Sequence, residues 1–177
     1  MRLFVAIDLP KEIKDYVYEL QGSLRNPKFA KLIFVSKKNL HLTLKFLGEL
    51  REEQLELLKG KLKKIKFTSF KLHLTTFGFY PDKNVPEVLW IGIVPQEYFK
   101  LLQQQIDEET LDFGDLKLGC HLTFLRIKSL KDRKKFFAKL DAIQLKSFEF
   151  EVTSFSLYKS KLSKDGPTYL PLETYPF

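Results

Sequence analysis

The alternation of apolar strand patterns with amphipathic helix patterns along the whole chain restricts the fold more than any other feature. Apolar residues recur at helical spacing over residues 10–24, 52–65, 96–110 and 132–140. Strand patterns cover residues 1–9, 32–35, 40–47, 69–77, 88–94, 120–127, 148–158 and 168–175, with turns predicted at 78–82 and 161–167. This order predicts an α+β fold. No linker or low-complexity stretch interrupts it, so we expect one domain over residues 1–177.

A similar strand carrying a His-x-Thr triplet occurs once in each half of the chain, at His41/Thr43 and at His121/Thr123. On a strand, side chains at i and i+2 point to the same face about 6.6 Å apart, so each triplet places an imidazole beside a hydroxyl. The repetition predicts two similar lobes whose sheets face each other. A third triplet, at His73, lies in the middle of a predicted strand, whereas the other two begin strands after turns. We therefore interpret His73 as a structural or surface residue.

Two opposed His-x-Thr strands have the groups needed to open a cyclic phosphodiester. One imidazole would take a proton from water and the other would protonate the departing ribose oxygen, since the ordinary histidine pKa is about 6.5. Hydroxyls of Thr43 and Thr123, with Arg126, would hold the phosphate oxygens. We assign His121 as the base and His41 as the acid, although the sequence fits the exchanged roles equally well. This scheme requires no metal.

The net charge of +8, from 30 Lys+Arg and 22 Asp+Glu, favours polyanionic partners such as RNA, but solvated lysine faces give the same excess. A single cysteine, Cys120, excludes an internal disulfide and a cysteine metal cluster. No apolar run approaches the roughly 18–20 residues that cross a bilayer. The apolar N-terminal stretch is too short for a signal peptide. We expect a cytoplasmic monomer without a membrane contact.

Several segments together resemble the RNA 2′,3′-cyclic phosphodiesterases of the 2H phosphoesterase superfamily, formerly called 2′-5′ RNA ligases. The strongest matches are residues 39–49, Asn-Leu-His-Leu-Thr-Leu-Lys-Phe-Leu-Gly-Glu, and 120–126, Cys-His-Leu-Thr-Phe-Leu-Arg. Further signatures follow in the expected order at residues 2–7, 88–92, 157–160 and 166–169. One departure is Cys120, where the family commonly has proline. Apolar neighbours favour a packed thiol there over a nucleophile.

The resemblance implies two lobes, each an antiparallel sheet with helices packed outside, facing each other across a central cleft. It selects His41 and His121 over His73, and it implies metal-independent hydrolysis at an RNA 3′ end with a 2′-phosphate product. The substrate would be an RNA 3′ end or a cyclic nucleotide. No Walker motif, Gly-rich phosphate loop or metal-ligand spacing occurs in the sequence, so we expect no cofactor and no ATP requirement.

Two other functions fit the same residues. ATP-independent joining of RNA ends through a 2′-5′ linkage is the reverse reaction at the same site. A basic RNA-binding module without catalysis is the alternative from another functional class, and a His41→Ala protein that binds and functions unchanged would favour it.

Aromatic side chains stack on bases in single-stranded RNA binders. The sequence does not choose among the candidates for that role, which are Phe46, Phe79, Tyr80 and Tyr158.

Overall fold

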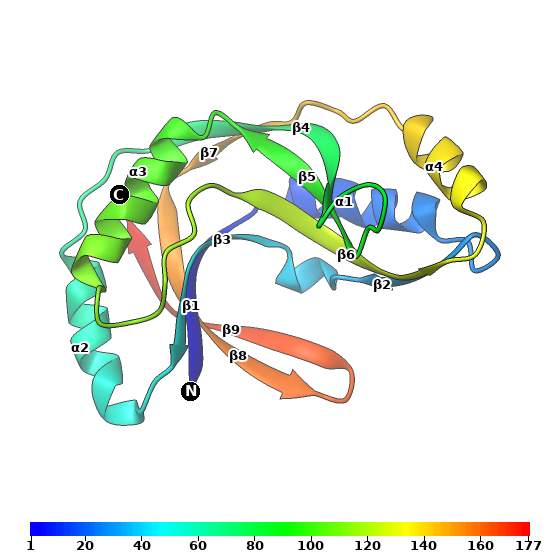
Figure 1. The fold of residues 1–177 in the computed structure, drawn as a ribbon. Coiled ribbons are helices and arrows are strands. Elements are labelled where there is room, and N and C mark those ends of the chain that lie inside the picture. Colours follow the sequence, from blue (N-terminus) through cyan, green and yellow to red (C-terminus); the bar gives the residue numbers. More distant parts are fainter.

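The computed structural model describes residues 1–177 and consists of two antiparallel sheets with four α-helices on their outer faces (Figure 1). Sheet A has the order β3-β1-β8-β9. Its strands are β1 (Arg2–Asp8), β3 (His41–Glu49), β8 (Ser154–Ser163) and β9 (Gly166–Pro176). Sheet B has the order β2-β6-β5-β4-β7. Its strands are β2 (Ala30–Phe34), β4 (Phe70–Tyr80), β5 (Val88–Val94), β6 (His121–Leu130) and β7 (Glu149–Val152).

The four helices form two pairs, and the apolar face of each pair packs against one sheet. Helices α1 (Lys11–Leu24) and α4 (Arg133–Asp141) contact each other, and α1 packs on β6 of sheet B. Helices α2 (Glu52–Lys63) and α3 (Glu97–Glu109) contact each other and pack on β9 and β3 of sheet A. The stripe of α3, formed by Phe99, Leu102 and Ile106, is fully buried. The predicted α+β fold with outer helices is confirmed.

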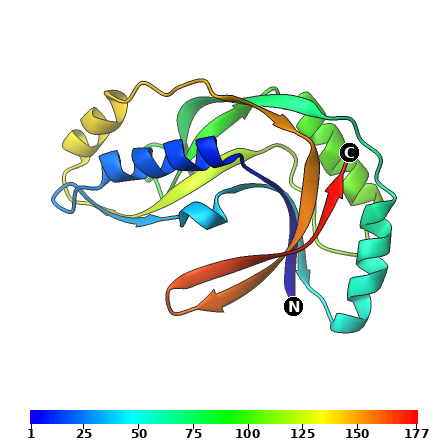
Figure 2. The same ribbon diagram turned by 180° about the vertical axis from the view of Figure 1, so that it is seen from behind.

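The two lobes do not correspond to the two halves of the chain. Sheet A combines β1 and β3 with the C-terminal strands β8 and β9, while sheet B takes strands from both halves. The helices cross over as well, because α1 leaves β1 of sheet A and packs against sheet B. Seen from behind, α1 lies across sheet B while the β8–β9 hairpin projects beneath it (Figure 2). Each lobe still carries one His-x-Thr strand, β3 in sheet A and β6 in sheet B.

The single strand predicted over residues 148–158 is wrong, because the chain changes sheets within it. Residues 149–152 form β7 and pair with β4, whereas residues from 154 onward form β8 and pair with β1 and β9. The alternation of apolar residues changes phase at this point, from Phe150 and Val152 to Phe155 and Leu157, and the prediction of one continuous strand missed that break. The predicted turn at 161–167 is also mostly strand, since the hairpin ladder closes on Ser163 and Gly166. Likewise, residues 78–80 belong to β4.

Buried polar side chains fasten β3, the strand of the first triplet, to α3. Lys45 is 2 % exposed, and its Nζ lies 2.6 Å from Asp107 Oδ1 and 3.0 Å from the carbonyl oxygen of Thr110. Gln103, 1 % exposed, donates from Nε2 to the carbonyl oxygens of Leu44 and Lys117, and its Oε1 accepts from the Gly119 amide. Helix α3 therefore holds both β3 and the segment that leads into β6.

Replacing Lys45 by alanine should lower the free energy of unfolding by about 2–3 kcal/mol. Removal of one partner of a buried pair costs about 3–5 kcal/mol, and the partly exposed Asp107 reduces that value. Lys59→Ala is the control, because its partner Glu56 is exposed and such pairs contribute about 0–1 kcal/mol. Urea unfolding of the three proteins measures the difference. Equal losses for the two variants would contradict a stabilising role of the buried pair.

Candidate active site

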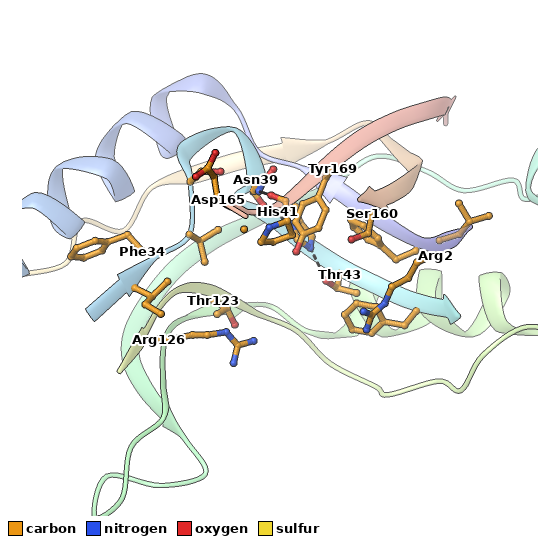
Figure 3. Close-up of a pocket in the computed structure, with 18 of the residues that line it drawn as sticks. Arg2, Phe34, Asn39, His41, Thr43, Thr123, Arg126, Ser160, Asp165 and Tyr169 are labelled. Carbon is orange, nitrogen blue, oxygen red and sulfur yellow. Dashed lines mark hydrogen bonds between the residues drawn. The ribbon is translucent and has the colours of Figure 1, made fainter. Parts of the chain in front are cut away.

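A cleft of about 360 Å³ lies between the two sheets and is lined by all five residues predicted to form the site. They are His41, Thr43, His121, Thr123 and Arg126. Figure 3 labels His41, Thr43, Thr123 and Arg126 among them. A second cavity of about 460 Å³ is continuous with it, because Thr43, His121 and Thr123 line both. His73 lines neither cavity. The structure thus brings together the two triplets that begin strands and leaves out the third. The catalytic roles of His41 and His121 stay a prediction.

His41 is held from both ring nitrogens. Nδ1 lies 2.6 Å from the carbonyl oxygen of Asn39, and Nε2 lies 2.9 Å from Thr43 Oγ1. The ring of Phe4 lies 5.1 Å from the imidazole and that of Tyr169 meets it edge-on at 5.2 Å. Because a carbonyl only accepts, Nδ1 carries a proton, and Nε2, beside the Thr43 hydroxyl, is the nitrogen that can gain or lose one. Burial lowers the pKa of His41 below 6.5, against the opposing effect of the Asn39 carbonyl.

His121 sits in a different environment at the start of β6. Its side chain is exposed, and no protein group forms a hydrogen bond with either ring nitrogen. The indole of Trp90 covers the imidazole, with centroids 5.0 Å apart and planes 28° apart. Partial burial lowers the pKa of His121 below 6.5. The two imidazoles therefore share a direction of pKa shift but differ in how they are held.

A β-bulge turns Arg126 into the cleft. Arg126 is five residues beyond His121, an odd offset that on a regular strand would point it to the opposite face. The pairing of β6 with β5 slips between Leu125 and Thr123, so Phe124 is the extra residue. Phe124 and Leu125 are both buried, and Arg126 returns to the face of the triplet.

Strand β3 contains a bulge at the equivalent place. Its pairing with β1 slips between Thr43 and Lys45, so Leu44 is the extra residue. The residue five beyond His41 is Phe46, which consequently lines the cleft and is 58 % exposed. The two sheets thus present Phe46 and Arg126 at equivalent positions of the cleft.

The structure adds residues that the sequence did not single out as site residues. Arg2 and Ser160 line the cleft together with Tyr169, which lies near Arg126. Burial raises the pKa of Tyr169, so its hydroxyl keeps its proton and remains a donor. All three lie in segments at 2–7, 157–160 and 166–169 that carry family signatures, which is the signal that marks them. Among the four aromatic candidates for base stacking, Phe46 alone lines the cleft.

Asn39 connects the β8–β9 hairpin with His41. It is 5 % exposed and lies in the 3₁₀ turn η1 (Lys37–Asn39) just before β3. Its side-chain Nδ2 donates to the carbonyl oxygen of Pro167 at 2.7 Å, while its own carbonyl accepts from His41. Since the hairpin contributes Asp165, Gly166 and Pro167 to the cleft wall, Asn39 sets the position of that wall relative to the imidazole.

The chain offers no cluster of three or more His, Cys, Asp or Glu side chains arranged to hold a metal ion. Burial raises the pKa of Cys120 to about 12, and Gln96 binds both the amide and the carbonyl of this residue. Cys120 is therefore a thiol at neutral pH, in agreement with its interpretation as a packed residue. No helix of the structure has the length and apolar character that a membrane span requires.

The chain is similar to known proteins over nearly its full length. A family model described as LigT like Phosphoesterase matches residues 7–90. The chain is 35% identical over 174 residues to the RNA 2′,3′-cyclic phosphodiesterase of Methanocaldococcus jannaschii, covering 96% of each chain. The chain belongs to the LigT-like phosphoesterase family. Its structure is similar to apo LigT of Escherichia coli, with a TM-score of 0.78 and 28% identity over 99% of this chain and 96% of that one.

The family model ends at residue 90, before the second His-x-Thr triplet. His121, Thr123 and Arg126 fall within the long alignments, which cover nearly all of the chain. The chain also resembles the E. coli LigT structure complexed with 3′-AMP, with a TM-score of 0.76 and 26% identity over 99% of this chain and 97% of that one. The expected resemblance to the 2H phosphoesterases is confirmed.

Asn39→Ala should free the hairpin and lower the free energy of unfolding by about 1 kcal/mol, the net value of a typical hydrogen bond. Amide hydrogen exchange over residues 160–170 should accelerate, because the hairpin loses its tie to η1. Ser163→Ala, which removes an exposed hydrogen bond within the same hairpin, is the matched control. Unchanged exchange at the hairpin in Asn39→Ala would show that Asn39 does not hold it.

Proposed function

We propose that this protein hydrolyses the 2′,3′-cyclic phosphodiester at an RNA 3′ end and leaves a 2′-phosphate. The observation that carries the proposal is the pair of His-x-Thr strands, one from each sheet, lining one cleft. A cleft with an imidazole on either wall fits a reaction in which an attacking and a leaving oxygen lie on opposite sides of phosphorus. The relatives named RNA 2′,3′-cyclic phosphodiesterase support the same reaction and the same substrate class.

The phosphate is held by the groups between the imidazoles. Hydroxyls of Thr43 and Thr123 donate to non-bridging oxygens, and Arg126 supplies a fixed positive charge beside them. Negative charge on those oxygens grows as water attacks, so these interactions strengthen in the transition state. Arg2 adds a second positive charge at the cleft, consistent with an RNA partner.

The chemistry needs one proton donor and one proton acceptor. The base removes a proton from water as the water oxygen bonds to phosphorus. The bond from phosphorus to the ribose 3′ oxygen then breaks, and the acid protonates that oxygen. Burial lowers the pKa of His41, but the Asn39 carbonyl at 2.6 Å and the nearby Asp8 carboxylate oppose this effect and favour the protonated form, so we assign His41 as the acid. His121 has no such partner, and burial favours its neutral form, which is that of a base.

The wild-type protein, treated with EDTA, should convert an oligonucleotide with a 2′,3′-cyclic phosphate end to a 2′-phosphate. His41→Ala and His121→Ala should each lose on the order of 10²–10⁴-fold in rate, whereas His73→Ala should stay close to wild type. Because burial lowers both imidazole pKa values below 6.5, the bell-shaped profile of kcat/KM should have its optimum below about pH 6.5. A His41→Ala protein with full activity would favour a non-catalytic RNA-binding module.

A substrate with sulfur in place of the 3′ bridging oxygen should separate the acid from the base. A thiol has a pKa of about 8.5, far below that of a ribose hydroxyl, so its thiolate leaves without a proton. His41→Ala should therefore recover most of its lost rate on this substrate, and His121→Ala should not. Single-turnover rates of both variants on the oxygen and sulfur substrates give the comparison. Recovery by His121→Ala instead would exchange the two roles.

A further inference from the structure

His121 lacks the hydrogen bonds that orient its counterpart. His41 is fixed from both ring nitrogens by Asn39 and Thr43, whereas neither nitrogen of His121 has a partner in the protein. The side chain of His121 is also exposed, so burial does not immobilise it. A catalytic imidazole must nevertheless keep one orientation, since displacement of a reacting group by about 1 Å can cost about 10²-fold in rate.

The indole of Trp90 is the aromatic group that lies against the His121 imidazole. The two rings stack with centroids 5.0 Å apart and planes inclined by 28°. Trp90 comes from β5, where it pairs with Thr123, and its neighbour Gly92 pairs with His121. The stack therefore connects two adjacent strands of sheet B and covers one face of the imidazole.

Gly78 leaves the space that the indole of Trp90 occupies. Gly78 on β4 pairs with Trp90, and a Cβ at Gly78 would lie 2.1 Å from the six-membered ring of the indole. Any side chain at Gly78 would thus push the indole away from the sheet. The glycine fixes the plane in which Trp90 lies and, through the stack, the plane of His121.

We propose that Trp90, seated over Gly78, is a positioning residue that sets the orientation of the His121 imidazole. The proposal rests on the function assigned above to His121. An indole face attracts cations, so the stack also stabilises the imidazolium that forms when His121 takes a proton from water. Loss of the indole should therefore reduce kcat, while KM, which reflects contacts of the substrate with other groups, should change little.

Three variants test whether the aromatic face of Trp90 and its position, rather than its volume alone, are needed for activity. Trp90→Leu removes the aromatic face, Trp90→Phe keeps a smaller one, and Gly78→Ala retains Trp90 but displaces it. Trp90→Leu and Gly78→Ala should each lower kcat on the order of tenfold, with Trp90→Phe recovering most of the loss. Phe79→Leu is the control, because Phe79 is the neighbour of Gly78 on β4 but packs against Phe137. It should change stability without changing kcat.

A double-mutant cycle tests whether Trp90 acts through His121. The loss caused by Trp90→Leu should disappear in a His121→Ala background, since the group being positioned is gone. The same tenfold loss in both backgrounds would overturn the proposal, because it would reveal a general structural effect. Circular dichroism on each variant establishes that the proteins compared are folded.

A measurement without substrate tests the positioning independently of the proposed reaction. The ring current of the indole should shift the His121 carbon-bound protons upfield in the wild-type NMR spectrum, and Trp90→Leu should remove that shift. A Trp90→Leu protein whose imidazole keeps its orientation overturns the proposal even if the enzyme is active. An inactive wild type with an intact, indole-dependent ring orientation would refute the proposed function instead and leave the positioning role standing.

Discussion

The site depends on the buried polar contacts that helix α3 makes with both of the segments carrying the histidines. Gln103 binds the Leu44 carbonyl on β3 and the Gly119 amide just before β6, and Lys45 anchors β3 through Asp107. These groups are buried, so each unmet hydrogen bond would cost about 1–3 kcal/mol. The contacts therefore fix the distance between strands of two different sheets. A cleft between two sheets would otherwise widen or close with small shifts of either sheet.

A second constraint is the bulge that follows each threonine. An extra residue, Leu44 in β3 and Phe124 in β6, turns the fifth residue beyond the histidine into the cleft. The two strands have the same irregularity but place different side chains in the cleft. Strand β3 places the exposed phenyl ring of Phe46 there, and β6 places the guanidinium of Arg126. The same backbone irregularity therefore brings two different side chains to equivalent positions of the cleft.

The two imidazoles also have different surroundings. His41 is enclosed by Phe4 and Tyr169 and is bound at both nitrogens, so its ring has one fixed orientation. His121 is open to the cleft and is backed by the indole of Trp90 alone. A site that needs one acid and one base gains from this asymmetry, because two identical environments would give two imidazoles with the same preference.

Local patterns in the sequence predict the α+β class, most helix and strand positions, and the placement of each histidine beside its threonine, because periodicity and the i, i+2 relation involve only nearby residues. The sequence also marked His41 and His121 through the family resemblance. The different strand partners on the two sides of Thr153, the position of Asn39 against Pro167 and the stack of Trp90 on His121 depend on the tertiary structure. So does the face on which Arg126 points, since strand alternation places it away from His121. Strand partners, bulges and contacts between sheets join residues distant in the chain, and their energies depend on packing that no local pattern contains.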